Sequence, residues 1–431
     1  MRTQHQFRLA LAASFLLLNI VPPSHATDWW EYSTVDNEGW TNIKDTSLAV
    51  LPDGTPAIAY LHNPGDWGGY DLRYAHRQDD AWAITVVREF VGNSASLAIL
   101  PTGQPAIAYD TTDLRFACCT DGDWTDTAIT PVTPGGGYVG LAIQPSGLPI
   151  ISYAHGREPY PDRDLMYAQY DGLDWTTLPI DTVGDVGTYS SITLLPSGAP
   201  AIAYYDATNG RLKFAWYTPD TWSWSTSVVD DSGNVGPHTS IATLPSGHPA
   251  ISYYDAAGAA LKYAQYDGEH WATTTIDAET GTGQYTSLAV LPSGQPTISY
   301  FNPNGAHIRY AWRSNGSWHI ATVDTSAPLG GYTSLAILPS GHPAIAYYRA
   351  DSAGGEGASA LIYAERLAPS GDCNCDGAVD YNDIGAFVLA LSGQAPYQEA
   401  YPDCNRIVAD CNDDAVVDYA DIDAFVMLLG Q

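Results

Sequence analysis

The stretch Ser287-Leu-Ala-Val-Leu-Pro-Ser-Gly-Gln-Pro-Thr-Ile-Ser-Tyr300 recurs in seven variant copies along the 431-residue chain. The proline that the copies share lies at Pro52, Pro101, Pro145, Pro196, Pro245, Pro292 and Pro339. Successive prolines are therefore 49, 44, 51, 49, 47 and 47 residues apart. Repeats of this length are typical of propellers and solenoids.

Each repeat predicts four short antiparallel strands. Pro292-Ser-Gly294 separates two apolar runs and predicts a hairpin turn, because proline fixes one backbone angle and glycine accepts a positive one. A third strand is expected at segments such as Leu261-Lys-Tyr-Ala264, and a fourth begins at a tryptophan, as in Trp271-Ala-Thr-Thr-Thr-Ile-Asp277. Four such strands form one propeller blade.

The two ends of the repeat array predict how the ring closes. The seventh copy stops after Leu361-Ile-Tyr-Ala364, and no tryptophan-initiated strand follows it. That strand instead precedes the first copy, as Trp30-Glu-Tyr-Ser-Thr-Val-Asp36. We therefore predict a mainly β fold, a seven-bladed propeller over residues 27–366 whose N-terminal strand completes the last blade. Closure of this kind removes exposed sheet edges.

Residues 1–26 have the pattern of a secretory signal peptide. Arg2 and Arg8 precede the apolar run 9–21, and Ser24-His-Ala26 offers small residues at a cleavage point. A membrane anchor needs about 20 apolar residues, and Pro22 interrupts this run before that length. We expect a secreted protein, released or held at the cell surface, without membrane insertion.

The net charge indicates which partners to expect, and the cysteine content indicates disulfides. With 17 basic and 48 acidic residues the net charge is −31, which repels phosphate groups, so nucleic acid is not an expected partner. Cys118 and Cys119 are adjacent, and the other four cysteines lie at positions 373, 375, 404 and 411. An even number of cysteines in an exported chain indicates disulfides, and the last four allow three pairings.

The C-terminal residues 372–431, after a linker at 367–371, contain two loops with the spacing of calcium ligands. Calcium takes six to eight oxygen ligands, and the loops place oxygens at positions 1, 3, 5, 7, 9 and 12. The predicted ligands are Asp372, Asn374, Asp376, Ala378, Asp380 and Asp383 in the first loop, and Asp410, Asn412, Asp414, Val416, Asp418 and Asp421 in the second. We expect two Ca²⁺ ions. The second loop fits less well, because Ala415 replaces the turn glycine Gly377.

These tandem loops, each with aspartate at position 12 and a helix directly after it, resemble a type I dockerin over about residues 371–430. The resemblance implies a calcium-dependent tether to a cohesin-like or cell-surface protein, in a polysaccharide-related context. Tyr381-Asn382 and Tyr419-Ala420 stand where cohesin-binding dockerins commonly carry small hydroxyl residues. This departure concerns partner recognition and leaves the calcium pattern intact.

A ligand site is predicted on the propeller axis. Two residues before each Ser-Leu-Ala strand, which we expect to be innermost, five blades carry an aromatic residue, whereas the first two carry Asp45 and Ser94. Aromatic rings with nearby carboxylates suit a sugar or another small ligand. The predicted residues are Tyr138, Tyr189, His238, Tyr285, Tyr332, Asp206 and Asp255. The alternative is that the repeated residues serve the same packing and turn contact in every blade.

The sequence favours a binding or scaffold protein over an enzyme, and we predict no catalytic residue. Glycosidases need two carboxylates across the scissile bond, whereas the apolar inner runs carry none. The alternative is a dockerin-bearing polysaccharide hydrolase or lyase with its acids in the blade-top loops, such as residues 156–164. Basic residues at one position of the third strands are expected to pair with aspartates between blades: Arg73, Arg115, Lys213, Lys262 and Arg309.

Overall fold

The computed structural model describes residues 30–37, 43–65, 69–79, 81–130, 136–156, 163–314, 316–325, 330–350, 359–367, 371–375, 379–411 and 416–429. The predicted signal peptide and most of the linker lie outside these ranges, as do the predicted ligands Asp376, Ala378, Asn412 and Asp414.

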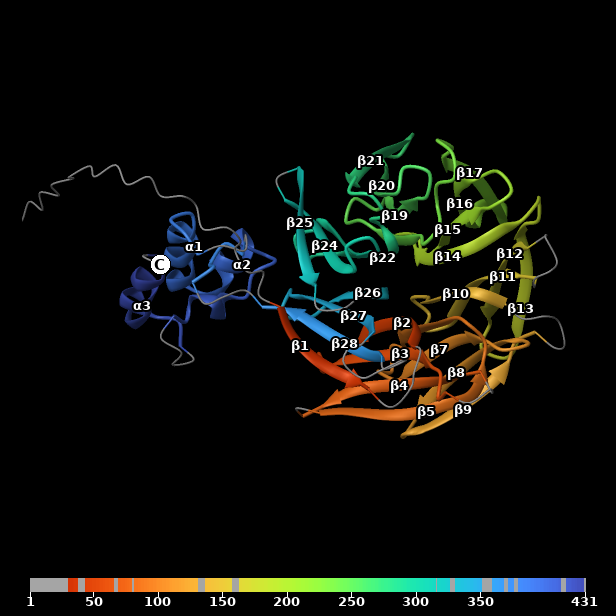
Figure 1. Cartoon of the computed structure of the whole chain (residues 1–431), viewed down its shortest axis with the longest axis horizontal. Helices are drawn as coiled ribbons and strands as arrows, with labels where there is room; N and C mark the ends of the chain where they lie inside the picture. Colours follow the sequence, from red (N-terminus) through yellow and green to blue (C-terminus); the bar gives the residue numbers. More distant parts are fainter. Residues whose placement is uncertain are drawn as a thin grey trace, which may run out of the picture.

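Seven four-stranded antiparallel sheets, arranged as the blades of a propeller, account for the described strands (Figure 1). The first strands of neighbouring blades contact one another around a closed ring, so they are innermost, as predicted. In blade order they are β2 (Ile43–Val50), β6 (Ala95–Ile99), β10 (Gly136–Ile143), β14 (Val186–Leu194), β18 (Ser240–Thr243), β22 (Gln284–Val290) and β26 (Gly330–Ile337). Blade one is thus β2–β5, and blade seven contains β26.

The other strands follow outward in the same blade order. The second strands are β3 (Pro56–His62), β7 (Pro105–Asp110), β11 (Pro149–His155), β15 (Pro200–Asp206), β19 (Pro249–Asp255), β23 (Pro296–Asn302) and β27 (Pro343–Ala350). The third strands are β4 (Tyr70–Gln78), β8 (Leu114–Thr120), β12 (Asp164–Tyr170), β16 (Arg211–Thr218), β20 (Ala260–Tyr266), β24 (His307–Ser314) and β28 (Ser359–Arg366). The outer strands are β5 (Ala81–Val91), β9 (Asp123–Ala128), β13 (Trp175–Asp181), β17 (Ser223–Asp230), β21 (Trp271–Asp277), β25 (Ser317–Asp324) and β1 (Trp30–Asp36).

The predicted ring closure is confirmed. Strand β1 pairs antiparallel with β28, with Tyr32 opposite Ala364 and Asp36 opposite Leu361. Blade seven therefore has the order β1-β28-β27-β26 and joins the start of the propeller to its end.

The repeated tryptophans of the outer strands explain how the blades pack. Each indole lies against an aromatic ring on the third strand of the preceding blade, with ring centroids 5.0–5.6 Å apart. The pairs are Trp82–Tyr363, Trp124–Tyr74, Trp175–Phe116, Trp224–Tyr167, Trp271–Phe214, Trp318–Tyr263 and Trp30–Tyr310. The hydrophobic core thus lies between blades, and every blade needs its neighbour to bury this surface.

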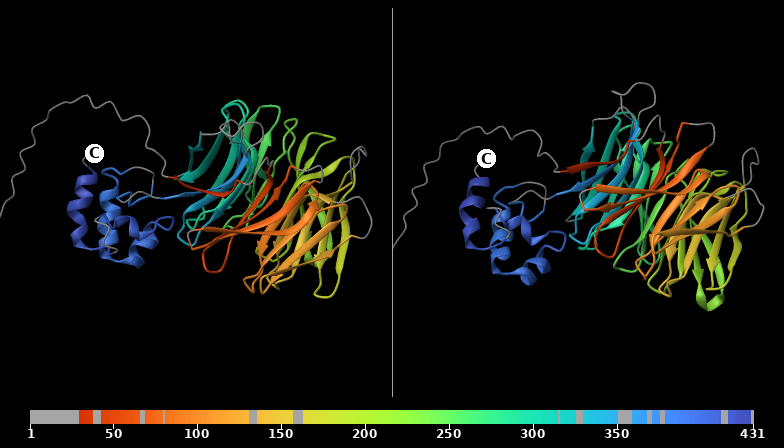
Figure 2. Two further views of the ribbon diagram at one scale, coloured as in Figure 1. Left: turned by 60° about the horizontal axis from the view of Figure 1, so that its bottom comes forward. Right: turned by 90° about the horizontal axis from the view of Figure 1, so that it is seen from below.

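A small helical module follows the propeller and lies beside blades six and seven (Figures 1 and 2). It contains α1 (Asp383–Ser392), α2 (Gln394–Ala400), α3 (Ile422–Leu428) and the short 3₁₀ turns η2 (Arg406–Ala409) and η3 (Tyr419–Asp421); a further turn, η1 (Pro219–Thr221), belongs to blade four. Phe387 stacks on Phe425 in the module core, with ring centroids 4.0 Å apart. The module meets the propeller where the Ser293 N–H donates to the Asp403 carboxylate at 2.6 Å. No helix in the described ranges is long and apolar enough to cross a bilayer.

Candidate functional site

A β-bulge at the start of the innermost strand places one side chain on the axis in blades one, three, four, six and seven. The β22–β23 register shifts between Gln284 and Ser287, and Tyr285 inside this bulge has φ 51°. Bulges re-aim the side chain that they carry. The same left-handed conformation recurs at Asp45, Tyr138, Tyr189, His238 and Tyr332, with φ between 45° and 56°. A non-glycine residue is strained at such an angle, so a recurrent contact must hold it.

Hydrogen bonds between neighbouring bulges supply this contact. In five blades the hydroxyl of the residue after this position donates to the backbone carbonyl of the equivalent aromatic residue in the preceding blade. In blade three Val139 follows Tyr138, and its N–H donates to the Ser94 hydroxyl oxygen instead. The Thr286 hydroxyl donates to His238 at 2.8 Å, and the Thr333 hydroxyl to Tyr285 at 2.6 Å. The repeated Tyr-Thr therefore does serve a contact that most blades need, as the alternative interpretation held. The rings themselves are left facing the axis.

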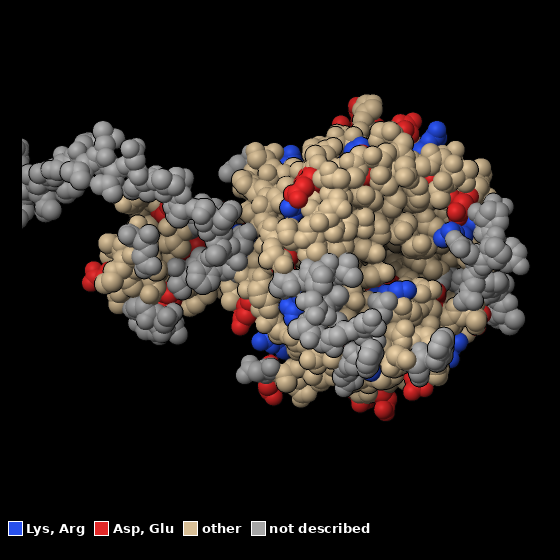
Figure 3. All heavy atoms as spheres, in the orientation of Figure 1, with Lys and Arg blue, Asp and Glu red and all other residues tan. Residues whose placement is uncertain are grey.

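The five predicted aromatic residues form a continuous wall, which we call the aromatic cup: Tyr138, Tyr189, His238, Tyr285 and Tyr332. Successive ring centroids are 4.6, 4.6, 4.4 and 4.3 Å apart. The cup lines a cavity of about 680 Å³, within the range of small-ligand sites. Burial lowers the pKa of His238 to about 4, so its imidazole is neutral at pH 7. A hollow near the centre of the propeller is visible in Figure 3.

Blades one and two complete the cavity with carboxylates instead of rings. Asp45 occupies the bulge position of blade one, and Asp110 ends strand β7 of blade two. Three consecutive backbone N–H groups hold the pair. Those of Asn93 and Ser94 donate to Asp110 at 2.8 and 2.7 Å, and that of Ala95 donates to Asp45 at 2.6 Å.

The two carboxyl groups and one lysine give this side of the cavity its charge. Burial raises the pKa of Asp45 to about 7, and the Asp110 carboxylate adds to the increase. The Ala95 N–H, the Ser94 side chain and the Lys44 ammonium act in the opposite direction. Near neutral pH the Asp45 carboxyl is therefore partly protonated.

The other two predicted acidic residues do not line the cavity. The Asp206 carboxylate accepts hydrogen bonds from the backbone and side-chain amides of Asn209 at 2.9–3.1 Å, and Asp255 accepts from the Gly258 N–H at 2.7 Å. Both close the turn after their own second strand, as aspartates in turns commonly do. Sequence reasoning grouped Asp110 with Asp206 and Asp255, because each follows a tyrosine at the end of a second strand, but did not select it as a site residue. It gave Asp45 no role, although the departure of blade one from the tyrosine pattern was the available signal.

The basic residues of the third strands lie at the blade junctions, away from the axis. The predicted pairing between blades is confirmed for Arg73, Lys213, Lys262 and Arg309, which contact Asp36, Asp181, Asp230 and Asp277 of the preceding blade. The prediction is wrong for Arg115, which pairs with Asp126 of its own blade. The outer strand of blade one carries Arg88 at the position where blade four carries its junction aspartate, and Arg88 also contacts Asp126.

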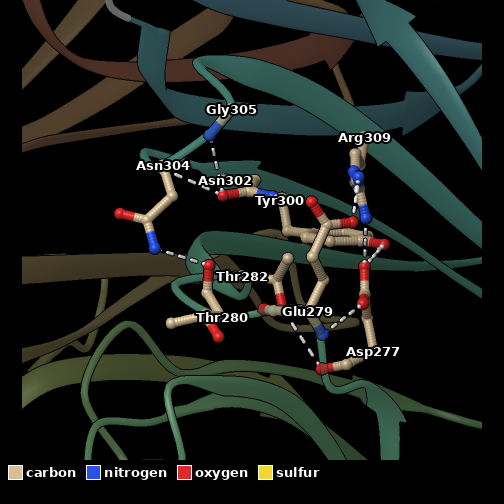
Figure 4. Close-up of polar contacts among 9 residues, drawn as sticks. All are labelled: Asp277, Glu279, Thr280, Thr282, Tyr300, Asn302, Asn304, Gly305 and Arg309. Carbon is tan, nitrogen blue, oxygen red and sulfur yellow. Dashed lines mark hydrogen bonds and ion pairs between the residues drawn. The ribbon is translucent and has the colours of Figure 1, made fainter.

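Figure 4 shows one such junction. The Asp277 carboxylate accepts from the Tyr300 hydroxyl and from the Arg309 guanidinium, both at 2.8 Å (Figure 4). In the equivalent junction burial alone would raise the pKa of Asp230, but the Lys262 ammonium and the Tyr253 hydroxyl outweigh it and hold the pKa at about 2. These basic groups are therefore occupied by structural contacts.

In the C-terminal loops the position-12 aspartates organise the described residues. The Asp383 carboxylate accepts the N–H groups of Asn374 and Asp380 at 2.9 and 2.8 Å. In the second loop Asp421 accepts those of Cys411 and Asp418, both at 2.8 Å. The carboxylates at positions 1 and 12 are buried in both loops: Asp372, Asp383, Asp410 and Asp421.

This donor set fits a hard cation, because it consists of carboxylate, amide and backbone oxygens. Of the ligands at positions 3, 5 and 7, only Asn374 and Val416 belong to the described residues. Within those residues no three His, Cys, Asp or Glu side chains gather as a metal site. One disulfide, Cys375–Cys404, ties the first loop to the segment after α2.

Comparison with known proteins shows only a shared fold. No protein-family model and no curated protein matches the chain. An ulvan lyase bound to -[GlcA(1-4)Rha3S]- aligns with 73% of this chain and 90% of its own, at 14% identity and a TM-score of 0.50. A protein of unknown function from Dyadobacter fermentans covers 78% and 98%, at 12% identity and 0.49. An α-L-arabinanase from Penicillium chrysogenum, complexed with arabinobiose, covers 77% and 97%, at 13% identity and 0.45.

Proposed function

We propose that this protein is a secreted carbohydrate-binding propeller, which holds a glycan in the aromatic cup and is tethered through its calcium-dependent C-terminal module. One observation carries the first part. Five rings from five successive blades line a single cavity on the axis, and hydrogen-bonding carboxyl groups complete its wall. Sugars offer apolar faces that stack on rings and hydroxyl groups that bond to carboxylates, so the cavity suits their chemistry.

Calorimetry of the mature protein against a panel of oligosaccharides tests this function. We expect Tyr285→Ala to weaken binding about tenfold, because truncation of a central aromatic contact commonly costs more than 1 kcal/mol. Tyr217→Ala is the matched control. This tyrosine lies on β16 against Trp224, with ring centroids 5.8 Å apart, and does not line the cavity. Equal loss in both variants, or no binding by the wild type, would contradict the proposal.

The second part concerns calcium. When bound, Ca²⁺ would be held by the oxygens of each loop, with Asp383 and Asp421 at position 12. Titration of the apo protein with Ca²⁺, followed by thermal unfolding, should raise the unfolding temperature of the module, because a ligand of the native state stabilises it by mass action. Asp383→Asn should weaken this response, whereas Asp220→Asn, in the exposed turn η1, should leave it unchanged.

The partner that we propose for the module is a cohesin-like or cell-surface protein. The two loop–helix units present the same exposed apolar side chains, which is uncommon for residues without a partner. They are Tyr381, Ile384 and Val388 in the first unit and Tyr419, Ile422 and Val426 in the second. Binding of the full chain to a purified cohesin domain should occur with Ca²⁺ and disappear with a chelator. No binding in Ca²⁺ would contradict a cohesin-type tether.

A catalytic alternative remains, a polysaccharide hydrolase or lyase acting in the same cavity. What favours it is the pairing of Asp45, whose pKa is about 7, with Asp110 in the cavity wall, because a general acid needs such a pKa. Release of reducing ends or of unsaturated products from a polysaccharide panel would support it if Asp45→Asn abolished turnover while binding persisted. Binding without turnover would support the binding function and contradict the catalytic alternative.

A further inference from the structure

The axial cavity contains basic side chains that are rare elsewhere in the chain. Lys44 and Arg163 line it, in a protein with 17 basic residues and a net charge of −31. Of the three lysines, Lys213 and Lys262 are committed to ion pairs with aspartates at the blade junctions. The Lys44 ammonium lies 4.7 Å from the centre of the Tyr70 ring, and none of the ion pairs found among the described residues includes it.

We propose that the axial cavity selects acidic glycans, with the Lys44 ammonium as the contact for a carboxylate or sulfate of one sugar ring. The inference rests on the proposed carbohydrate function and adds the class of sugar. An ammonium group is a compact charge with three donors, so it pairs with either anion. The neighbouring cup would stack the apolar face of the same or the next ring.

The carboxyl groups beside Lys44 oppose its charge less than two free carboxylates would. The Asp110 carboxylate accepts two backbone N–H groups, whose dipoles offset part of its negative charge. The Asp45 carboxyl, whose pKa burial raises to about 7, carries less than a full negative charge near neutral pH. The Arg163 guanidinium also lines the cavity, but its ion pair with Asp185, at 3.1 Å, leaves Lys44 as the principal cation there.

The acidity of the remaining surface disfavours the binding of anionic glycans outside the cavity. A net charge of −31 repels an anionic glycan at long range, so unspecific adsorption of such a ligand is disfavoured. At physiological ionic strength this repulsion is screened beyond roughly 8 Å. A contact inside a partly buried cavity is screened much less. Preference for an acidic sugar would therefore report on the cavity itself.

Matched ligands test the inference on the mature full-length protein. Calorimetry at slightly acidic pH compares an oligogalacturonide with its methyl ester, and a sulfated galactan oligosaccharide with its desulfated form. Within at least one pair we expect the charged member to bind about tenfold more tightly, since a hydrogen bond to a charged group contributes about 1.5–3 kcal/mol. The pair that shows the preference identifies the anion as uronate or sulfate.

Variants at Lys44 separate charge from structure. Lys44→Gln should lower the affinity for the acidic ligand about tenfold and change that for its neutral partner less than about twofold, whereas Lys44→Arg should keep the preference. Unfolding temperatures of both variants are measured in parallel. Equal binding of charged and neutral ligands, or equal loss of both in Lys44→Gln, would overturn the inference. If neutral glycans still bound in a Tyr285-dependent way, the proposed carbohydrate-binding function would stand and only the preference for acidic glycans would fail. If no glycan bound, the function and the preference would both fail.

Discussion

Blades four to seven and blades one and two form the same ring with different contacts. In the regular blades an aromatic bulge residue, a hydroxyl donor and a Tyr–Asp–basic junction recur with little change, as at Tyr285, Thr333 and Asp277. Around blades one and two, Asp45 replaces the ring, and Asp126 serves an arginine of its own blade. The difference indicates that the residues shared by most repeats hold the ring together, whereas residues that differ from the repeat, such as Asp45, supply charged groups of the cavity.

The largest expected effect compares two junction aspartates. Asp230→Ala should lower the free energy of unfolding by about 3–5 kcal/mol, because it leaves the Lys262 ammonium buried without its counter-charge. Asp126→Ala should cost only about 1 kcal/mol, since its pair with Arg115 is more exposed. Urea unfolding measures both. Equal losses would show that the irregular junction matters as much as the regular one.

The same junction predicts an acid limit. The pKa of Asp230 lies at about 2 in the folded protein and near 3.8 when unfolded, so its contribution to stability is present above about pH 4 and is lost as the pH falls towards 2. Unfolding curves of wild type and Asp230→Ala should therefore converge as the pH falls through this window. A difference in unfolding free energy between the two proteins that stayed constant across this pH range would contradict the pairing of Asp230 with Lys262.

Asp45→Tyr gives blade one the residue that four other blades carry at this position and tests whether the Asp45 carboxylate is needed for stability. We expect a loss of about 1–3 kcal/mol in unfolding free energy, because the Ala95 N–H loses its acceptor in a partly buried place. The preference for acidic ligands should change as well. Asp45→Asn is the control, since its side-chain oxygen still accepts that N–H. An unchanged stability in Asp45→Tyr would show that the carboxylate does not hold blade two.

A smaller effect, about 1 kcal/mol, is expected for Ser240→Ala. The Ser240 hydroxyl oxygen accepts the Leu288 N–H of the next blade at 3.0 Å, a contact that recurs between most blades. Ser246→Ala, in an exposed turn, should change stability by less than about 0.5 kcal/mol. Chemical unfolding of both variants decides; equal values would mean that the repeated serine has no role in joining blades.

The smallest effect concerns pH and binding. The groups facing Asp45 are Lys44 on its own strand, Ser94 and Asp110 of blade two, and Tyr332 of blade seven. As the pH rises through about 7, Asp45 gains negative charge beside Lys44. An acidic glycan should therefore bind about threefold more weakly at about pH 8 than at about pH 6. Calorimetry with Asp45→Asn should show a flat profile; a profile of opposite slope would contradict this assignment.

The fold was predictable because its signals are repeated seven times. The proline–glycine turns and the outer-strand tryptophans have the same structural role in every copy, and the displaced strand at Trp30 supplies the seventh tryptophan. The cavity was predictable only in its aromatic half. Asp206 and Asp255 follow a tyrosine as Asp110 does, yet they close their own turns, whereas Asp110 accepts the N–H groups of the neighbouring loop. Which N–H group an aspartate meets depends on loop geometry that spacing alone does not contain.

The pairing of β1 with β28 also has a consequence for biosynthesis. The strand that appears first on the ribosome, Trp30–Asp36, has its partner more than 300 residues later, at Ser359–Arg366. Domains that fold during synthesis start from their N-terminal part, but here that part must wait. The circle is thus completed only after nearly the whole chain has been made. Until then the unpaired edge of the seventh sheet would need protection from neighbouring chains.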